Sequence, residues 1–211
     1  MKQLQVLVAT THQSDFSLVE KMNITCDAIL ANQTDHNAVS EQVYPFGTVR
    51  MISTDTRGVG INRNTALDAA EAEFVLFADD DVTYADGMPE RLLSEFAAHP
   101  DADVLIFGID YTKNGVVIER RRPGSRRRHL WNAMRFGAAV TAVRLRAVRD
   151  AGIRFSPYFG GGCLYCAGED TLFLRDCLRS GRKVYSTDAV LGTCRKDTST
   201  WFTGCNEKYF Y

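Results

Sequence analysis

The 211-residue chain is predicted to form a single α/β domain, in which helices flank a mainly parallel sheet. Short apolar runs alternate with helix-like segments over residues 1–110, which is the pattern of βα units. Hydrophobic residues make up 45% of the chain, enough for a substantial core. The sequence contains no repeat, low-complexity linker or clear domain boundary, so one domain is expected.

The expected strands are apolar runs that end at polar or glycine-rich segments. They cover Leu4–Val8, Ala28–Ala31, Val49–Ser53, Phe74–Phe77, Val104–Phe107, Ala139–Val143 and Lys183–Ser186, with a hairpin arm at Val116–Glu119 after the turn signal Asn114-Gly115. Helices are expected over Asp15–Lys21 and Gly58–Glu71, from Asp86-Gly87-Met88-Pro89 onward, and over Thr171–Ser180, where Gly181 ends the helix.

Charge is distributed unevenly along the chain, although the net charge is only −1. Residues 110–128 include seven basic and two acidic side chains, a net charge of +5, so the rest of the chain carries −6. No overall positive charge points to nucleic acid as a partner. The arginines of Arg120–Arg128 have two interpretations: they protect a hairpin edge from strand pairing, or they contact an anionic acceptor at a membrane surface.

The N-terminus has no secretory signal pattern, and no apolar run approaches the ~20 residues of a membrane span. The expected location is therefore cytoplasmic, either free or peripheral to the inner face of the membrane. Six cysteines are then expected to be free thiols. Cys163 and Cys166 form a CxxC, but two further zinc ligands are not nearby, which favours packing residues in a glycine-rich loop over a zinc site.

An acidic triplet, Asp79-Asp80-Asp81, directly follows the buried strand expected at Phe74–Phe77. In an open α/β sheet, ligands bind beyond the carboxyl ends of strands, and carboxylates there can hold a divalent cation with substrate phosphates. In an extended segment Asp79 and Asp81 would face one side and Asp80 the other. A solvated acidic turn is the alternative, and the position after an apolar strand favours the functional interpretation.

Two further segments combine glycine with charged residues at helix starts. Gly58-Val59-Gly60 precedes Arg63 and Asn64, but the third glycine and the lysine of nucleotide-binding fingerprints are absent. A glycine turn with a solvated arginine and an anion-binding turn both remain open there. Glu169 and Asp170 open a later helix, where helix capping alone could explain them, although a general base needs a carboxylate on a rigid element.

Taken in order, these motifs resemble those of family 2 glycosyltransferases over nearly the whole chain. The resemblance rests on Leu4–Thr11, on GVGINRNTAL at 58–67, on FADDD at 77–81 and on GEDTLF at 168–173. The tail STWFTGCNEKYFY at 199–211 is similar to a subset that builds bacterial surface polysaccharides. The resemblance implies a GT-A fold, with a Rossmann-like, mainly parallel sheet and a small antiparallel hairpin region.

The implied activity is inverting transfer of a sugar from a nucleoside diphosphate donor, usually a UDP-sugar with Mn²⁺ or Mg²⁺, to a hydroxyl of a saccharide or lipid-linked acceptor. Residues 1–110 would form the nucleotide-binding half and residues 111–211 the acceptor-binding half. The resemblance also assigns roles by position. Thr10 and Asn32 would flank the nucleotide base, and Arg63 would reach the nucleotide. Asp79 would take the ribose and Asp81 the metal and diphosphate, with Asp79 as a second metal ligand, while Asn64 and Asp80 would be further substrate-binding residues. Asp170 would be the general base, and Glu169 would orient the acceptor or donor sugar.

The sequence departs from the family pattern in two places. The acid that grips the base after the third strand is not clearly matched, and Asp55 is the nearest candidate. A metal-binding histidine near the end is missing from Gly192–Lys196, where Cys194 is a poor substitute for a hard cation and Asp197 could supply an oxygen. A nucleotidyltransferase and a catalytically inactive sugar-nucleotide-binding module therefore remain alternatives.

Overall fold

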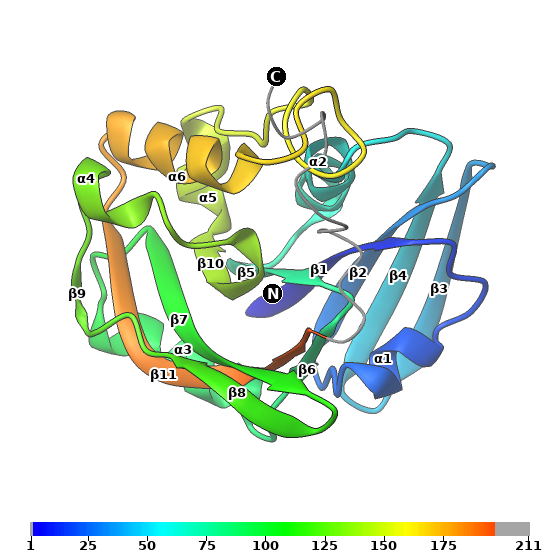
Figure 1. The fold of residues 1–211 in the computed structure, drawn as a ribbon. Coiled ribbons are helices and arrows are strands. Elements are labelled where there is room, and N and C mark those ends of the chain that lie inside the picture. The colour runs from blue at the N-terminus through cyan, green and yellow to red at the C-terminus, as the bar shows by residue number, and fades with distance from the viewer. Residues whose placement is uncertain (1, 197–211) are drawn as a thin grey trace.

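A computed structural model describes residues 2–196, so the tail motif at 199–211 and Asp197 lie outside the described residues. Its strands form one eleven-stranded sheet in the order β3-β4-β2-β1-β5-β10-β7-β11-β6, with β8 beside β7 and β9 beside β11 (Figure 1). The strands are β1 Leu4–Thr11, β2 Asp27–Gln33, β3 Ala38–Tyr44, β4 Gly47–Thr54, β5 Phe74–Asp79, β6 Val82–Tyr84, β7 Val104–Lys113, β8 Val116–Arg121, β9 Arg126–Arg127, β10 Thr141–Arg144 and β11 Val184–Arg195.

The expected mainly parallel sheet is confirmed. Strands β4, β2, β1 and β5 pair in parallel, β10 runs antiparallel to both β5 and β7, and β11 is parallel to β7. Six of the eleven strands therefore point the same way, and their carboxyl ends lie along one edge of the sheet. This edge is where an α/β sheet places its ligands.

Helices cover both faces of the sheet, as Figure 1 shows. They are α1 Ser17–Lys21, α2 Val59–Ala69, α3 Met88–Ala98, α4 Leu130–Ala133, α5 Leu145–Asp150 and α6 Glu169–Arg179, with a 3₁₀ turn at Ala138–Val140. Because neighbouring strand residues point to opposite faces, Leu76 packs with the α1 and α3 side while Val75 and Phe77 pack with α2, α5 and α6. No helix within residues 2–196 is long and apolar enough to span a membrane.

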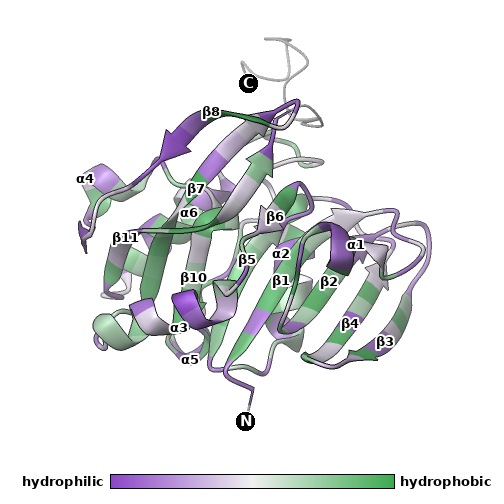
Figure 2. Ribbon diagram, turned by 90° about the horizontal axis from the view of Figure 1, so that it is seen from below, coloured by the Kyte–Doolittle hydropathy of each residue, from purple (hydrophilic) through white to green (hydrophobic). Residues whose placement is uncertain are grey.

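The antiparallel hairpin expected from Asn114-Gly115 joins β7 to β8. Lys113 pairs with Val116 across the turn, and Asn114 and Gly115 both have positive φ, at 50° and 75°. Two left-handed residues in a two-residue loop match the twist of the flanking strands. The hairpin is hydrophobic where β8 begins and hydrophilic where it ends (Figure 2).

Several boundaries differ from the sequence expectations. The helix expected over Asp15–Lys21 begins two residues later, at Ser17. The strand expected at Lys183–Ser186 continues to Arg195, because β11 pairs with β7 and, through Gly192–Cys194, with β6. The edge strand β3 and the short α5 were not expected, since β3 has a polar, largely exposed sequence and α5 is only six residues long.

Candidate active site

The functional residues lie where the strands of the parallel group end. β1 ends at Thr11, β5 ends at Asp79, and β11 ends at Arg195, while α6 begins at Glu169. These ends line two adjoining cavities of about 350 Å³ and 670 Å³. Four residues line both cavities and so form the boundary between them: Asp79, Asp81, Cys166 and Arg195.

Arg63 is the centre of a buried ion-pair cluster beside the smaller cavity. Its side chain is only 2% exposed, and it donates to Asp79 at 2.7 Å, to Asp170 at 2.8 Å and to Glu169 at 2.9 Å. The guanidinium also lies over the ring of Phe155, at 5.3 Å from its centroid. The charges of Asp79, Asp170 and Glu169 outweigh the effect of burial and raise the pKa of Arg63, so it stays protonated.

This cluster explains the arginine in the first turns of α2. An arginine there is unfavourable for the helix dipole alone, and the structure supplies anionic partners from β5 and α6. The sequence resemblance placed Arg63 against the nucleotide, whereas its side chain lines the smaller cavity and faces three carboxylates. One guanidinium thus ties β5 to α6.

The glycines before Arg63 bring loop 155–163 close to α2. A Cβ on Gly60 would lie 2.1 Å from the carbonyl oxygen of Ser156, so only glycine fits there. The amide of Val59 donates to the carbonyl of Gly161 at 2.9 Å. The first amide of α2 is therefore occupied by the protein itself, while Gly58 and Val59 of this glycine turn also line the larger cavity.

A layer of three aromatic rings packs beneath the ion pairs, on the face of the sheet that α2, α5 and α6 cover. Phe155 and Phe173 stack at 4.3 Å, and Phe77 meets both edge-on at 5.0 and 5.3 Å. Phe77 precedes Asp79 on β5, and Phe173 follows Asp170 by one turn on α6. Buried aromatic packing therefore fixes the elements that carry the carboxylates.

Asp170 is a carboxylate in a mostly closed environment. Its side chain is 27% exposed, and Gly137 packs against it closely enough that a Cβ there would lie 3.3 Å from Oδ2. Burial raises the pKa of Asp170 to about 6, opposed by Arg63 and reinforced by Glu169 and Asp79. A carboxyl with a pKa near 6 can accept a proton near neutral pH.

The three aspartates of the triplet have three different partners. Asp79 ends β5 and binds Arg63, and Asp80 accepts a hydrogen bond from the hydroxyl of Thr10 at 2.6 Å. Asp81 accepts one from the thiol of Cys194 at 3.4 Å. Asp80 and Asp81 lie in a turn between β5 and β6, so the extended segment expected from the sequence ends at Asp79.

Asp81 and Cys194 affect each other's protonation. Burial, followed by the charge of Asp79, raises the pKa of Asp81 to about 6. Burial and the neighbouring Asp81 raise the pKa of the Cys194 thiol to about 12, so it remains a protonated donor. Mg²⁺ and Mn²⁺ prefer oxygen ligands, so a protonated thiol is a poor ligand for them.

The residues present fit a divalent cation only together with a ligand's oxygens. Within residues 2–196, no group of three or more His, Cys, Asp or Glu side chains is arranged to hold a metal. Asp79 and Asp81 offer hard carboxylate oxygens at the cavity boundary, although one oxygen of each already has a protein partner. Mg²⁺ commonly binds through one or two carboxylates plus substrate phosphates, and this donor set is compatible with that.

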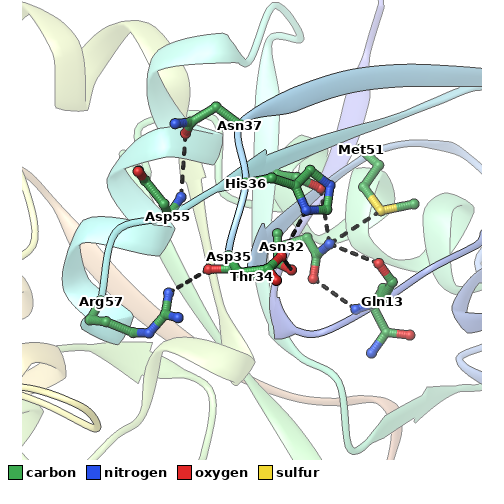
Figure 3. Close-up of polar contacts among 10 residues, drawn as sticks. Gln13, Asn32, Thr34, Asp35, His36, Asn37, Met51, Asp55 and Arg57 are labelled. Carbon is green, nitrogen blue, oxygen red and sulfur yellow. Dashed lines mark hydrogen bonds and ion pairs between the residues drawn. The ribbon is translucent and has the colours of Figure 1, made fainter.

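Two predicted substrate-binding residues, Asn32 and Asn64, line neither cavity and bind the protein instead. Asn32 is fully buried, accepts from the amide of Gln13 at 2.9 Å and donates to the Gln13 carbonyl (Figure 3). It also donates to the Ser53 hydroxyl at 3.0 Å. Asn64 forms two 2.9 Å hydrogen bonds with the backbone of Phe155. The hydrogen bonds of both side chains therefore hold neighbouring segments of the protein together.

Figure 3 also shows where the carboxyl ends of β2 and β4 meet. Arg57 donates to the carbonyl of Thr34 at 2.7 Å, and the amide of Asp55 donates to the side chain of Asn37 at 3.3 Å. Arg57 lines the larger cavity, whereas Asp55 is not among its lining residues. The sequence missed Arg57 and also Asn62, which lines the same cavity and donates to the carbonyl of Thr10 at 3.1 Å.

Several arginines of Arg120–Arg128 form contacts within the protein. Arg121 and Lys196 both bind Glu119, at 2.7 and 2.9 Å, and both lie over the ring of Tyr111. Arg128 is 1% exposed and bonds Ser186 at 2.7 Å and the carbonyl of Pro123. The expectation that Arg120–Arg128 as a whole meets a membrane is therefore wrong for Arg128, which lies inside the protein.

Comparison with known proteins identifies the class that this fold and site define. The model of glycosyl transferase family 2 matches residues 29–159, which is more than half of the chain. The chain belongs to glycosyl transferase family 2, and it has the GT-A fold. A search of curated proteins finds no match.

Solved structures with a similar fold include several of S. aureus TarS. Residues 1–349 of TarS in complex with UDP-GlcNAc match with a TM-score of 0.72 at 17% identity, over 99% of this chain and 63% of that one. The same TarS fragment in complex with UDP matches with a TM-score of 0.68 at 18% identity, over 92% of this chain and 60% of that one. A longer TarS structure matches with a TM-score of 0.67 at 18% identity, over 92% of this chain and 36% of that one. This chain therefore spans less than two thirds of the length of each of these structures.

Proposed function

We propose that this glycosyltransferase is an inverting enzyme, which transfers a sugar from a UDP-sugar to a hydroxyl of a saccharide or lipid-linked acceptor. The observation that carries the proposal is the position of Asp170, held by Arg63 at 2.8 Å beside the smaller cavity, while Asp79 at the boundary contacts the same arginine. The similar TarS structures contain UDP-GlcNAc and UDP, which supports a uridine diphosphate donor in the larger cavity.

The two cavities give the reaction its geometry. The acceptor would occupy the smaller cavity, and its hydroxyl oxygen would attack the anomeric carbon of a donor lying at the boundary. Asp170 takes the hydroxyl proton, a new bond forms from the acceptor oxygen to the anomeric carbon, and the bond from that carbon to the diphosphate breaks. The electron pair of the broken bond stays on the diphosphate oxygen. Attack and departure on opposite sides invert the anomeric configuration.

The remaining predicted residues divide between binding and positioning. Thr10 and Asp80 line the larger cavity as a hydrogen-bonded pair and would contact the nucleotide. Asp79 and Asp81 would hold Mn²⁺ or Mg²⁺ together with the diphosphate, and such a cation supplies Lewis-acid stabilisation of the leaving group. Arg63 is assigned as a positioning residue, because it fixes Glu169 and Asp170 on α6 relative to Asp79 on β5.

The proposed biological setting is surface polysaccharide synthesis on the cytoplasmic side of a membrane. The exposed arginines of β9, Arg126 and Arg127, could meet anionic lipid there. Residues 1–110 would form the donor half and residues 111–211 the acceptor half. Consistent with this division, the hairpin residues Tyr111 and Arg121 line only the smaller cavity.

Product analysis tests the proposal against its rivals. The protein is incubated with UDP-GlcNAc and Mn²⁺, with and without candidate acceptors, and the released nucleotide is identified. Release of UDP supports a glycosyltransferase reaction, whereas formation of pyrophosphate with a nucleotide triphosphate and a sugar phosphate would indicate a nucleotidyltransferase. Binding of UDP without any UDP release, with or without acceptor, would indicate an inactive binding module.

A further inference from the structure

Arg195 is a cation at the boundary of the two cavities that the ion-pair cluster does not use. Its side chain is exposed and lines both the 350 Å³ and the 670 Å³ cavity. Within residues 2–196 its guanidinium forms no ion pair with a carboxylate. Arg63 and Arg121, which line the smaller cavity, differ in this respect: Arg63 pairs with Asp79 and Arg121 with Glu119. The charge of Arg195 is thus available to a ligand at the boundary.

The backbone of Arg195 is held firmly although its side chain is exposed. It is the last residue of β11, where its amide donates to the carbonyl of Asp81 at 3.1 Å and its Cα pairs with Thr112 of β7. The preceding residue, Cys194, pairs with both Val82 and Tyr111. The fixed backbone places the side chain of Arg195 within reach of the acidic turn, where it lines both cavities.

The charges around the boundary require a positive group if a diphosphate is to enter. Asp79, Asp81, Glu169 and Asp170 all line the smaller cavity, and Arg63 is the one cation that binds three of them. These five groups sum to −3 when all are ionised. Like charges repel strongly in a partly closed site, so a diphosphate there needs cations beside it, and Arg195 adds one to the proposed Mn²⁺ or Mg²⁺.

We propose that Arg195 is a catalytic residue that contacts the diphosphate of the donor and stabilises the negative charge left on it when the sugar departs. The inference rests on the proposed function, since it takes a nucleoside diphosphate sugar as the ligand. Breaking the bond to the sugar adds one negative charge to the diphosphate, and the guanidinium binds that charge more strongly in the product than in the donor. Arg195 therefore stabilises the transition state as well as the bound nucleotide.

The test compares ligands that differ in their phosphates. Calorimetry measures binding of UDP, UMP and uridine to the full chain with Mn²⁺ and, separately, with chelator. Arg195→Gln should weaken UDP binding by about 10- to 100-fold, the scale of a charged hydrogen bond, and leave uridine binding unchanged. Arg195→Lys should recover part of the loss, because an ammonium keeps the charge without the two-pronged geometry.

Arg179→Gln is the matched control, because Arg179 is exposed at the far end of α6 and lines neither cavity. It should bind UDP as the unmodified protein does. Equal UDP affinity in Arg195→Gln and the unmodified protein would overturn the role of Arg195, as would an equal loss for UDP and uridine. Failure of the unmodified protein to bind UDP at all would instead contradict the proposed donor.

Discussion

The guanidinium of Arg63 lies 2.8 Å from the carboxylate of Asp170 and 2.7 Å from that of Asp79. These contacts join the N-terminal end of α6 to the carboxyl end of β5 through a side chain that is almost fully buried. The proposed base and the proposed donor carboxylate are therefore positioned by the same group.

The first prediction concerns the base. Asp170→Asn should bind UDP normally but lose transfer by at least ~100-fold, the lower scale of general-base contributions, because the amide cannot take the acceptor proton. Steady-state kinetics and calorimetry measure the two effects. Asp150→Asn, an exposed change on α5, is the control, and near-normal turnover of Asp170→Asn would show that Asp170 only caps its helix.

The second prediction concerns pH. The pKa of Asp170 is raised to about 6, and its protonated form cannot act as a base. The value of kcat/KM should therefore fall below about pH 6, by about tenfold for each further pH unit. A profile that stays flat from pH 7 to pH 5, recorded with the donor at subsaturating concentration, would contradict this role of Asp170.

The third prediction concerns stability. A folded-state pKa above the ordinary value of 3.8 means that the ionised carboxyl of Asp170 is unfavourable in the fold, and stability is lost as the pH rises through about 6. Asp170→Asn removes this charge and should raise Tm at pH 8, by a few degrees if the gain is about 1 kcal/mol. The gain should shrink at pH 5, and thermal unfolding at both values measures it.

The fourth prediction concerns Arg63 itself. Arg63→Met leaves Asp79, Glu169 and Asp170 without their shared cation and should lower the free energy of unfolding by about 3–5 kcal/mol. Denaturant unfolding measures this, with Arg179→Met as the exposed control. A loss below about 1 kcal/mol would show that solvent, and not Arg63, compensates the three carboxylates.

The fifth prediction concerns the metal. Two carboxylates cannot hold a hard cation firmly alone, so Mn²⁺ should bind measurably only when UDP is present, and Asp81→Asn should abolish most of the coupling. Electron paramagnetic resonance follows the free Mn²⁺. Micromolar binding without nucleotide would contradict this and would direct attention to an oxygen donor such as Asp197, outside the described residues.

The sequence predicted the parallel strands and their carboxyl-end residues well, because Phe74–Phe77 and the acidic triplet form a local pattern of apolar strand and polar end. It could not predict that β10 inserts antiparallel between β5 and β7, since that depends on the pairing of distant segments. The partners of Arg63 were hidden for the same reason: Asp170 lies 107 positions away along the chain. No local sequence pattern marked Arg195 as a site residue, because it reaches the boundary of the two cavities only through the full length of β11.

The four boundary residues, Asp79, Asp81, Cys166 and Arg195, line both cavities, which the proposed function assigns to the donor and the acceptor. A substitution at any of them should alter the KM for both substrates at once. Engineering a new donor preference is therefore better attempted at residues that line only the larger cavity, such as His12, Gln33 and Arg57. A new acceptor preference would be sought at Tyr111 and Phe136, on the opposite side of that shared wall.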